Sequence, residues 1–271
     1  MAKKQRRRAA ATADKYALYQ ESVQDTESDI ALAERVFKQE YGRPPRLLRE
    51  DFSGTSLMAC DWVTRHADNH AWAIDLDPEP LAWGRERNLA KLDAGQAKRV
   101  ELVQADVMEA ECGPVDVCVA FNFSYFLFKT REQLLGYLKK ARSTLKEEGI
   151  FMVDVYGGAE AQTTMTETRE QDADFDYVWD QDLFDPITHD VVNYIHFEFP
   201  DGSEMRKAFR YDWRLWSLPE LCDLMKDAGF KETRVYWEGT EKKTNEGNGI
   251  FRRAEHAPDD PAWIAYIVAI P

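Results

Sequence analysis

The stretch that decides the fold is Leu47-Leu48-Arg49-Glu50-Asp51-Phe52-Ser53-Gly54-Thr55-Ser56, an apolar run that ends in two carboxylates and a turn of small residues. A helix is predicted over residues 57–65, and a second apolar run, residues 71–74, then leads to Asp75. Gly54 has no side chain, so the turn can approach a ligand closely. Asp75 falls about 20 residues past the turn, where a carboxylate can accept two hydrogen bonds from ribose hydroxyls. This order predicts an α/β protein whose parallel sheet binds a nucleoside at its edge.

The pattern continues along the chain. Residues 100–105 form a third apolar run, which ends in Asp106, and residues 115–121 form a continuous apolar strand that should lie at the centre of the sheet, buried on both faces. A helix over 131–145 and a strand over 150–155 complete a fifth αβ step. Three successive strands that end in carboxylates favour a functional reading of all three acids.

This combination resembles the class I S-adenosylmethionine-dependent methyltransferases, whose pattern is acid-x-Gly-x-Gly-x-Gly with an acid after the second strand and another after the third. The turn looks like that of bacterial members with an Arg-Glu-Asp-Phe-small-Gly-Thr sequence. The resemblance implies S-adenosylmethionine as the cofactor and a Rossmann-like, seven-stranded sheet. It places Glu50 near the methionine amino group, Gly54 at the central glycine, Asp75 on the ribose, and Asp106 with Val107 on the adenine. The cofactor-binding residues expected from it are Tyr19, Glu50, Phe52, Gly54, Asp75, Leu76, Asp106, Val107 and Asn122.

The turn departs from the family pattern at two positions, because Phe52 and Ser56 replace the outer glycines. A redox dinucleotide fold is the competing interpretation of such a unit. A missing first glycine would crowd a pyrophosphate, whereas the methyl donor carries no phosphate and tolerates the loss better.

Composition and charge limit the classes of function. The chain has 271 residues, 44% of them hydrophobic, and a formal net charge of −14. No apolar run is long enough to span a membrane, and no apolar stretch follows the basic N-terminus, so a cytoplasmic protein without a membrane partner is expected. Four cysteines in apolar contexts lack metal-ligand spacing, so free thiols and no metal site are expected; they are Cys60, Cys112, Cys118 and Cys222.

Charge is distributed unevenly. The N-terminal basic residues indicate a disordered end or, as the alternative, a nucleic-acid arm; they are Lys3, Lys4, Arg6, Arg7 and Arg8. Ten acids against the single base Arg169 lie between residues 159 and 190: Glu160, Glu167, Glu170, Asp172, Asp174, Asp176, Asp180, Asp182, Asp185 and Asp190. This acidic field argues against a nucleic-acid partner. It serves either as a solvated face or to attract a cationic substrate such as an amine.

The chain is predicted to divide into four parts. Residues 1–45 form a basic tail and an N-terminal helical cap, and residues 46–158 form the cofactor-binding core. Residues 159–212 form an acidic antiparallel β lid, with strands at 176–180, 190–199 and 205–212. Residues 213–271 supply a C-terminal helix and two closing strands, 231–237 and 263–270, joined by a polar loop at 239–249.

The substrate site is expected where Asn122-Phe123-Ser124-Tyr125 follows the fourth strand. This tetrad resembles the Asn-Pro-Pro-Tyr motif of base-amine methyltransferases but lacks both prolines. Asn122 and Tyr125 are the candidate catalytic residues, with a strand-end turn as the structural alternative for Asn122. Nearby aromatic faces can stabilise the cationic donor. Two lid histidines, His189 and His196, are weaker candidate bases.

The sequence therefore predicts an S-adenosylmethionine-dependent methyltransferase acting on a small-molecule substrate, with nitrogen slightly favoured over oxygen because of the acidic lid. A nucleic-acid or protein methyltransferase, supported only by the basic tail and the Asn-Phe-Ser-Tyr tetrad, is the first alternative. The second is a non-catalytic S-adenosylmethionine-binding module, consistent with a turn that has lost two glycines.

Overall fold

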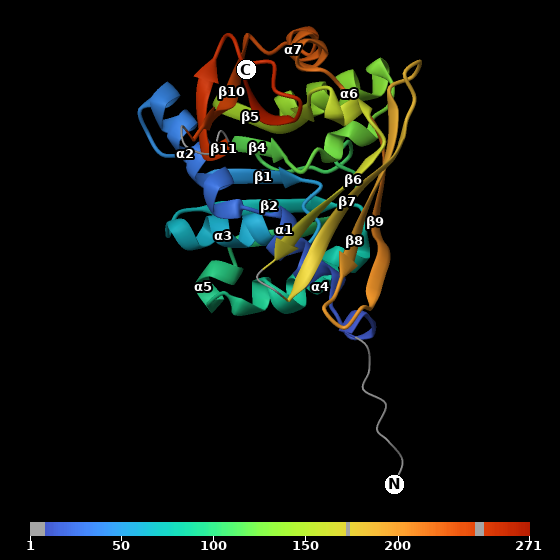
Figure 1. The fold of residues 1–271 in the computed structure, drawn as a ribbon. Helices are drawn as coiled ribbons and strands as arrows, with labels where there is room; N and C mark the ends of the chain where they lie inside the picture. The colour runs from blue at the N-terminus through green and yellow to red at the C-terminus, as the bar shows by residue number, and fades with distance from the viewer. Residues whose placement is uncertain (1–8, 172–173, 242–246) are drawn as a thin grey trace.

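A computed structural model describes residues 9–171, 174–241 and 247–271. Its centre is an eight-stranded sheet with the order β11-β10-β12-β5-β4-β1-β2-β3, and a separate four-stranded antiparallel sheet has the order β6-β7-β8-β9 (Figure 1). The strands of the large sheet are β1 (Leu47–Asp51), β2 (His70–Asp75), β3 (Val100–Gln104), β4 (Val115–Ala120), β5 (Leu145–Gly157), β10 (Glu232–Thr240), β11 (Gly247–Ala254) and β12 (Trp263–Ile270).

The order of the strands fixes where a ligand can bind. The chain runs outward from β1 through β2 to β3, returns to β4 on the other side of β1, and continues to β5, with all these neighbours parallel. β12 runs antiparallel to both β5 and β10. In open α/β sheets a crevice forms at the carboxyl ends of the strands where the order reverses. Here that point lies between β1 and β4.

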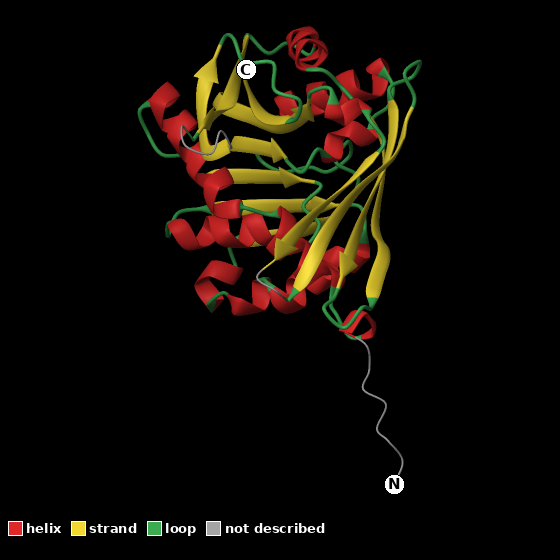
Figure 2. Cartoon of the chain, in the orientation of Figure 1, coloured by secondary structure: helices red, strands yellow, loops and turns green. Residues whose placement is uncertain are grey.

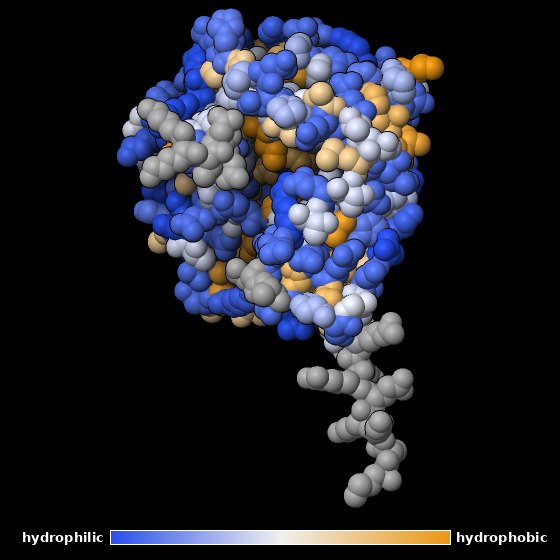
Figure 3. All heavy atoms as spheres, viewed as in Figure 1, coloured by the Kyte–Doolittle hydropathy of each residue, from blue (hydrophilic) through white to orange (hydrophobic). Residues whose placement is uncertain are grey.

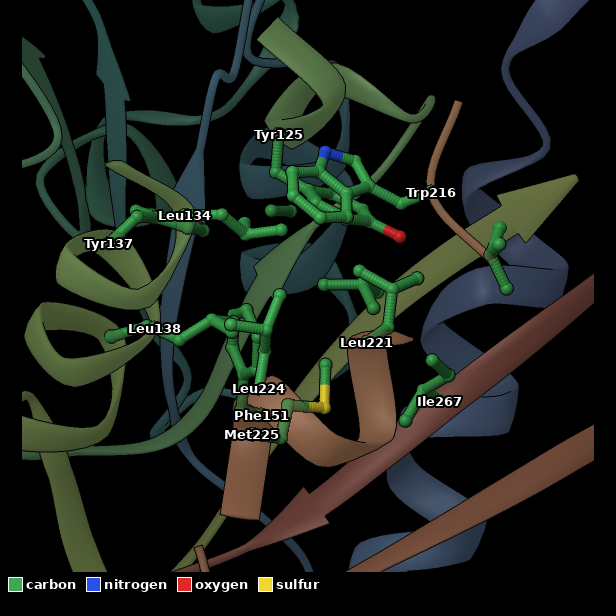
Figure 4. Packing of buried hydrophobic residues seen from close by; sticks show 14 of the residues in the cluster. Tyr125, Leu134, Tyr137, Leu138, Phe151, Trp216, Leu221, Leu224, Met225 and Ile267 are labelled. Carbon is green, nitrogen blue, oxygen red and sulfur yellow. The ribbon is translucent and has the colours of Figure 1, made fainter. Parts of the chain in front are cut away.

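Helices cover both faces of the large sheet (Figure 2). On one face α2 (Thr26–Tyr41) and α3 (Leu57–Arg65) bury Phe37 and Trp62 against the strands. On the other face α6 (Arg131–Ser143) and α7 (Leu218–Asp227) bury Leu138 and Met225 (Figure 4). Every residue of β4 is buried, as predicted for a central strand, and all are apolar except Asp116, which accepts the N–H groups of Arg46 and Leu47.

The small sheet stands across the carboxyl ends of the large one (Figure 1). We call it the lid; its strands are β6 (Met165–Gln171), β7 (Phe175–Phe184), β8 (Asp190–Glu198) and β9 (Glu204–Arg214). The N-terminal helix α1 (Lys15–Val23) packs on it, since Tyr16 and Tyr19 contact the ring of Phe209 at centroid distances of 6.0 and 4.9 Å. The cap and the lid thus share a small apolar cluster.

The structure confirms the predicted fold class, including the N-terminal helical cap and the inserted antiparallel lid. The predicted number of strands was wrong in both sheets. β11 lies partly in the segment predicted as a loop and makes the large sheet eight-stranded, and β6 adds a fourth strand to the lid. Both are edge strands with no fully buried residue, so their sequences lack the apolar alternation that reveals a strand.

The basic tail residues Lys3 to Arg8, and Asp172 of the acidic run, lie outside the described residues. In the part of the chain that is described, no helix has both the length and the apolar character needed to span a membrane.

Candidate active site

The turn between β1 and α3 adopts left-handed backbone at every second residue. The φ angles of Phe52, Gly54 and Ser56 are 58°, 51° and 57°. Left-handed backbone is routine for glycine and strained for other residues. A Cβ atom built on Gly54 would meet no heavy atom within 4 Å, so the turn faces open space there. Although Phe52 and Ser56 replace glycines of the resembled pattern, the turn keeps the backbone that those glycines would favour.

Two helices hold this turn in place. A Cβ atom on Gly84 of α4 (Pro78–Arg87) would lie 2.1 Å from the carbonyl oxygen of Thr55, so α4 can approach the turn only because residue 84 is glycine. The Nδ2 of Asn88, at the end of α4, donates to the same oxygen at 2.9 Å. From α1, the Nε2 of Gln20 donates to the Thr55 hydroxyl at 2.6 Å. The turn is therefore fixed before any ligand binds.

Asp75 lies directly against the turn. Its Oδ2 accepts a hydrogen bond from the Gly54 N–H at 2.7 Å, and its Oδ1 accepts one from the Asp77 N–H at 2.9 Å. Each carboxylate oxygen has a second lone pair, so both can still accept a hydroxyl. Burial raises the pKa of Asp75. The next residue, Leu76, is 66% exposed, which leaves an apolar side chain at the edge of this site.

The remaining residues expected on the cofactor take different places. Glu50 is buried, its Oε2 accepts from the Ala59 N–H of α3 at 3.0 Å, and burial raises its pKa to about 8. Asp106 is exposed at the end of β3 and accepts from the Met108 N–H at 2.9 Å. Val107 is buried in the core. The structure therefore brings Glu50, Gly54 and Asp75 together and leaves Asp106 accessible on the neighbouring strand.

The carboxyl end of β4 is held by a buried acid of β5. Asn122 and Phe123 both have φ near 56°, and their N–H groups donate to the Oδ2 and Oδ1 of Asp154 at 2.7 and 2.9 Å. Burial raises the pKa of Asp154 to about 8. Tyr125, the predicted catalytic partner of Asn122, lies in the core beside Trp216, and its hydroxyl donates to the Asp154 carbonyl (Figure 4). Asn122 reaches the cavity described below, and Tyr125 does not.

A cavity of about 430 Å³ lies between the cap, the carboxyl ends of β4 and β5, and the lid. Figure 3 shows a hollow with hydrophobic atoms at its floor in a mostly hydrophilic surface. Aromatic residues dominate the wall: Tyr19, Phe123, Tyr156, Tyr177, Trp179, Tyr211, Trp213, Trp263 and Tyr266. Its acids are Asp25, Asp29, Asp154, Glu160, Glu167 and Glu238, and Arg169 is the only base among the described residues that line it. Aromatic faces with carboxylates suit a cationic organic group.

The source of this negative charge differs from the sequence-based expectation. Of the nine acids between residues 159 and 190 that the structure describes, Glu160 and Glu167 line the cavity, and Glu167 pairs with Arg169 at 2.7 Å. The cap and β5 contribute Asp25, Asp29 and Asp154 instead. The other described acids of the run lie off the cavity wall; Glu170, Asp174 and Asp182 are exposed, and Asp176, Asp180, Asp185 and Asp190 are half-buried.

Neither lid histidine lies on the cavity wall that the structure describes. The Nδ1 of His196 accepts from the Lys207 N–H at 2.9 Å, and its Nε2 lies 3.2 Å from Asp180 Oδ2. His196 thus holds β7, β8 and β9 together. His189 packs against Phe184 at the β7–β8 connection.

The sequence-based interpretation missed several residues of the cavity, above all Asp29, Asp154 and Tyr266. Two of them had a signal, since Asp154 and Tyr266 are polar side chains inside apolar strands and are adjacent in the β5–β12 register. Asp29 had none, because an acid in the first turn of a helix is usual. Its position over the cavity depends on how the cap folds back on the sheet.

These residues fit S-adenosylmethionine. The open space at Gly54 admits a ligand, and Asp75 has unused acceptor capacity for ribose hydroxyls. Leu76 offers an apolar surface on which the adenine ring can pack. Among the described residues, no group of three or more His, Cys, Asp or Glu side chains is arranged to hold a metal ion.

No protein-family model matches the chain, and no curated protein matches it by sequence. Solved structures do match. One is an S-adenosylmethionine-dependent methyltransferase from Clostridium acetobutylicum, 16% identical, with 94% of this chain and 97% of that chain covered and a TM-score of 0.64. Another is DesVI of Streptomyces venezuelae, which is 16% identical and has a TM-score of 0.68; the match covers 95% of this chain and 97% of that chain. A third is CalS10, an amino pentose methyltransferase from Micromonospora echinaspora, which is 13% identical and has a TM-score of 0.65; the match covers 94% of this chain and 96% of that chain. The chain therefore has the α/β fold of these methyltransferases.

Proposed function

We propose that this protein is an S-adenosylmethionine-dependent methyltransferase that acts on a small-molecule amine. The observation that carries the proposal is the left-handed backbone at residues 52, 54 and 56, held beside the carboxylate of Asp75. That turn supplies a close-approach surface and ribose acceptors at the place where the strand order reverses. The fold shared with methyltransferases of known structure supports the same conclusion.

Each donor-binding residue then has a role. Asp75 accepts the ribose hydroxyls, Gly54 leaves room for the nucleoside, and Asp106 with Val107 borders the adenine. Glu50 fixes the start of α3 through the Ala59 N–H and presents a carboxyl group toward the methionine end. Tyr19, which lines the cavity, and Phe52, whose ring packs on Phe128 and Tyr137, are the remaining residues proposed to border the donor.

The acceptor is proposed to occupy the aromatic cavity. S-adenosylmethionine supplies, when bound, an electrophilic methyl group on a cationic sulfur. The protein has to align the nucleophile with that methyl group and exclude water. Asn122 and Phe123 stand at the end of β4, where the donor turn and the cavity meet, and Asp154 holds both backbone N–H groups. Tyr125 supports this corner from the core through its hydrogen bond to the Asp154 carbonyl.

Nitrogen is favoured over oxygen as the methylated atom because the cavity wall has six acids and one base among its described residues. A cationic ammonium group enters such a field readily. The same field disfavours a nucleic-acid acceptor, whose phosphates it would repel. KedS8, a sugar N-methyltransferase from Streptoalloteichus with a TM-score of 0.63, shows that this fold carries nitrogen chemistry in another protein.

Transfer of a labelled methyl group tests the proposal. Purified protein is incubated with methyl-labelled S-adenosylmethionine and a panel of matched small amines and phenols, including amino sugars. Label is expected in amines and not in the matched phenols. Binding of S-adenosylhomocysteine without transfer to any acceptor would instead identify a non-catalytic binding module.

A further inference from the structure

Asp29 differs from the other acids of the cavity in the partners of its carboxylate. It lies in the first turn of α2, and its Oδ1 accepts a hydrogen bond from the hydroxyl of Tyr266 on β12 at 2.5 Å. Its Oδ2 has no hydrogen-bond partner among the residues that the structure describes. Both side chains line the cavity. One oxygen of Asp29 is thus fixed by a phenol, and the other can accept a ligand proton.

We propose that Asp29 is the proton acceptor for the amine substrate and that Tyr266 positions it. The inference rests on the proposed function and names a catalytic residue for it. The substrate enters as an ammonium ion and donates a hydrogen bond to Asp29 Oδ2. One N–H bond then breaks and one O–H bond forms, which leaves a neutral amine with a free lone pair and a neutral carboxylic acid. The proton passes to solvent before the next turnover.

Four of the other five carboxylates of the cavity accept hydrogen bonds or pair with a base, and the fifth, Glu160, lies exposed at the rim. Both oxygens of Asp154 accept backbone N–H groups at the end of β4. Glu167 pairs with Arg169, and Glu238 accepts from the Gly249 N–H at 2.7 Å. Asp25 caps α2 through the Ser28 N–H. Asp29 combines a fixed position with an unused oxygen.

The electrostatics of the site suit this role. Burial raises the pKa of Asp29 to about 7, and the hydrogen bond from Tyr266 opposes that rise. A base is most effective when its pKa lies near the working pH.

The first test compares wild-type protein with Asp29→Asn, Tyr266→Phe and the control Glu27→Gln, which removes an exposed charge from the same helix. The rate is measured against pH with the best amine of the panel. Wild-type kcat/KM should decrease below about pH 7 with unit slope, the acid limb expected when activity is lost on binding one proton. Asp29→Asn should lower kcat by roughly 100-fold or more and move that limb up to the pKa of the amine itself. Tyr266→Phe should displace the limb, and Glu27→Gln should match wild type.

Two binding measurements make the test independent of turnover. Calorimetry with dimethylammonium chloride, whose N–H groups can donate to Asp29 Oδ2, should show binding to wild type and Glu27→Gln, and loss of binding in Asp29→Asn. Calorimetry with S-adenosylhomocysteine should give affinities within about twofold for all variants. The proposal is overturned if Asp29→Asn keeps the acid limb, or if it weakens S-adenosylhomocysteine and spares the amine, since Asp29 would then serve the donor. Should wild type transfer no methyl group, the proposed function fails, and failure of wild type to bind dimethylammonium would then reject the role of Asp29 separately.

Discussion

Single residues of the β1–α3 turn set both its shape and its open space. Gly54 and Gly84 are needed for opposite reasons. A Cβ atom on Gly54 enters open space, whereas a Cβ atom on Gly84 would lie 2.1 Å from the Thr55 carbonyl oxygen. Alanine at residue 54 should therefore affect mainly ligand binding, whereas alanine at residue 84 should affect the packing of α4 that supports the turn.

We expect Gly54→Ala to remain folded and to lose S-adenosylhomocysteine affinity by roughly tenfold or more, because the methyl group occupies space that the ligand needs. The left-handed φ of 51° should cost about 1 kcal/mol of unfolding free energy. Gly84→Ala should lose more stability and affinity together, because α4 must move off the turn. Urea denaturation and calorimetry on both variants check this, and an unaltered affinity in Gly54→Ala would show that the ligand does not approach the turn.

At the scale of elements, strand β1 presents different acids to its two faces. Glu50 points to α3, while Arg49 and Asp51 form a fully buried ion pair with a 2.7 Å contact between Nε and Oδ1. Arg49 also donates to the carbonyls of Val107 and Ala110 at 2.8 and 3.1 Å. It therefore ties β1 to the segment that follows β3. The adjacent carboxylates of the Arg-Glu-Asp sequence thus have separate tasks.

Removing one member of a buried pair leaves the other charge uncompensated. Arg49→Met should lower the free energy of unfolding by about 3–5 kcal/mol. Adding Asp51→Asn to that variant should restore part of the loss, since asparagine is neutral and can still accept from the Tyr137 hydroxyl, which lies 2.9 Å from Asp51 Oδ2. Equilibrium urea denaturation measures both. If the double variant were less stable by the sum of the two single losses, the two side chains would not act as a pair.

Across the whole molecule, buried acids gather at the carboxyl edge of the large sheet. Burial raises the pKa of Glu50 and of Asp154 to about 8 each, and that of Asp29 to about 7. For Glu50, the folded pKa lies above the unfolded value near 4.5. Its stability penalty is therefore absent below the unfolded pKa and grows as pH rises, until it is complete above about pH 8.

Glu50→Gln, which keeps an acceptor for the Ala59 N–H, should therefore gain stability relative to wild type as pH rises from 5.5 to 7.5, by about 2–3 kcal/mol. Urea denaturation at the two pH values measures the difference. A constant offset between the proteins would mean that Glu50 titrates alike in the folded and unfolded chain.

The sequence was sufficient for the core of the fold, because β1 to β5 and their helices carry strong apolar periodicity and terminal acids. It also predicted the turn at Gly54 and the strand end at Asp75, which depend on local turn chemistry and a fixed spacing; their roles in donor binding stay a prediction. The lining of the cavity was harder to predict from the sequence. Asp29 reaches it only through the path of α2, and Tyr125 turns into the core because its hydroxyl finds the Asp154 carbonyl. The edge strands β6 and β11 are set by pairing and not by burial, so composition gave no sign of them.

Calorimetric titration with S-adenosylhomocysteine tests donor binding at the turn, using wild type, Asp75→Asn and Asp75→Ala. Wild type should bind at one site. Asp75→Ala should lose about 1.5–3 kcal/mol of binding free energy, because hydrogen bonds to a charged group are among the stronger ones, and Asp75→Asn, which keeps one acceptor oxygen, should lose less. No saturable binding by wild type, or an unchanged affinity in Asp75→Ala, would contradict a donor site on β1 and β2.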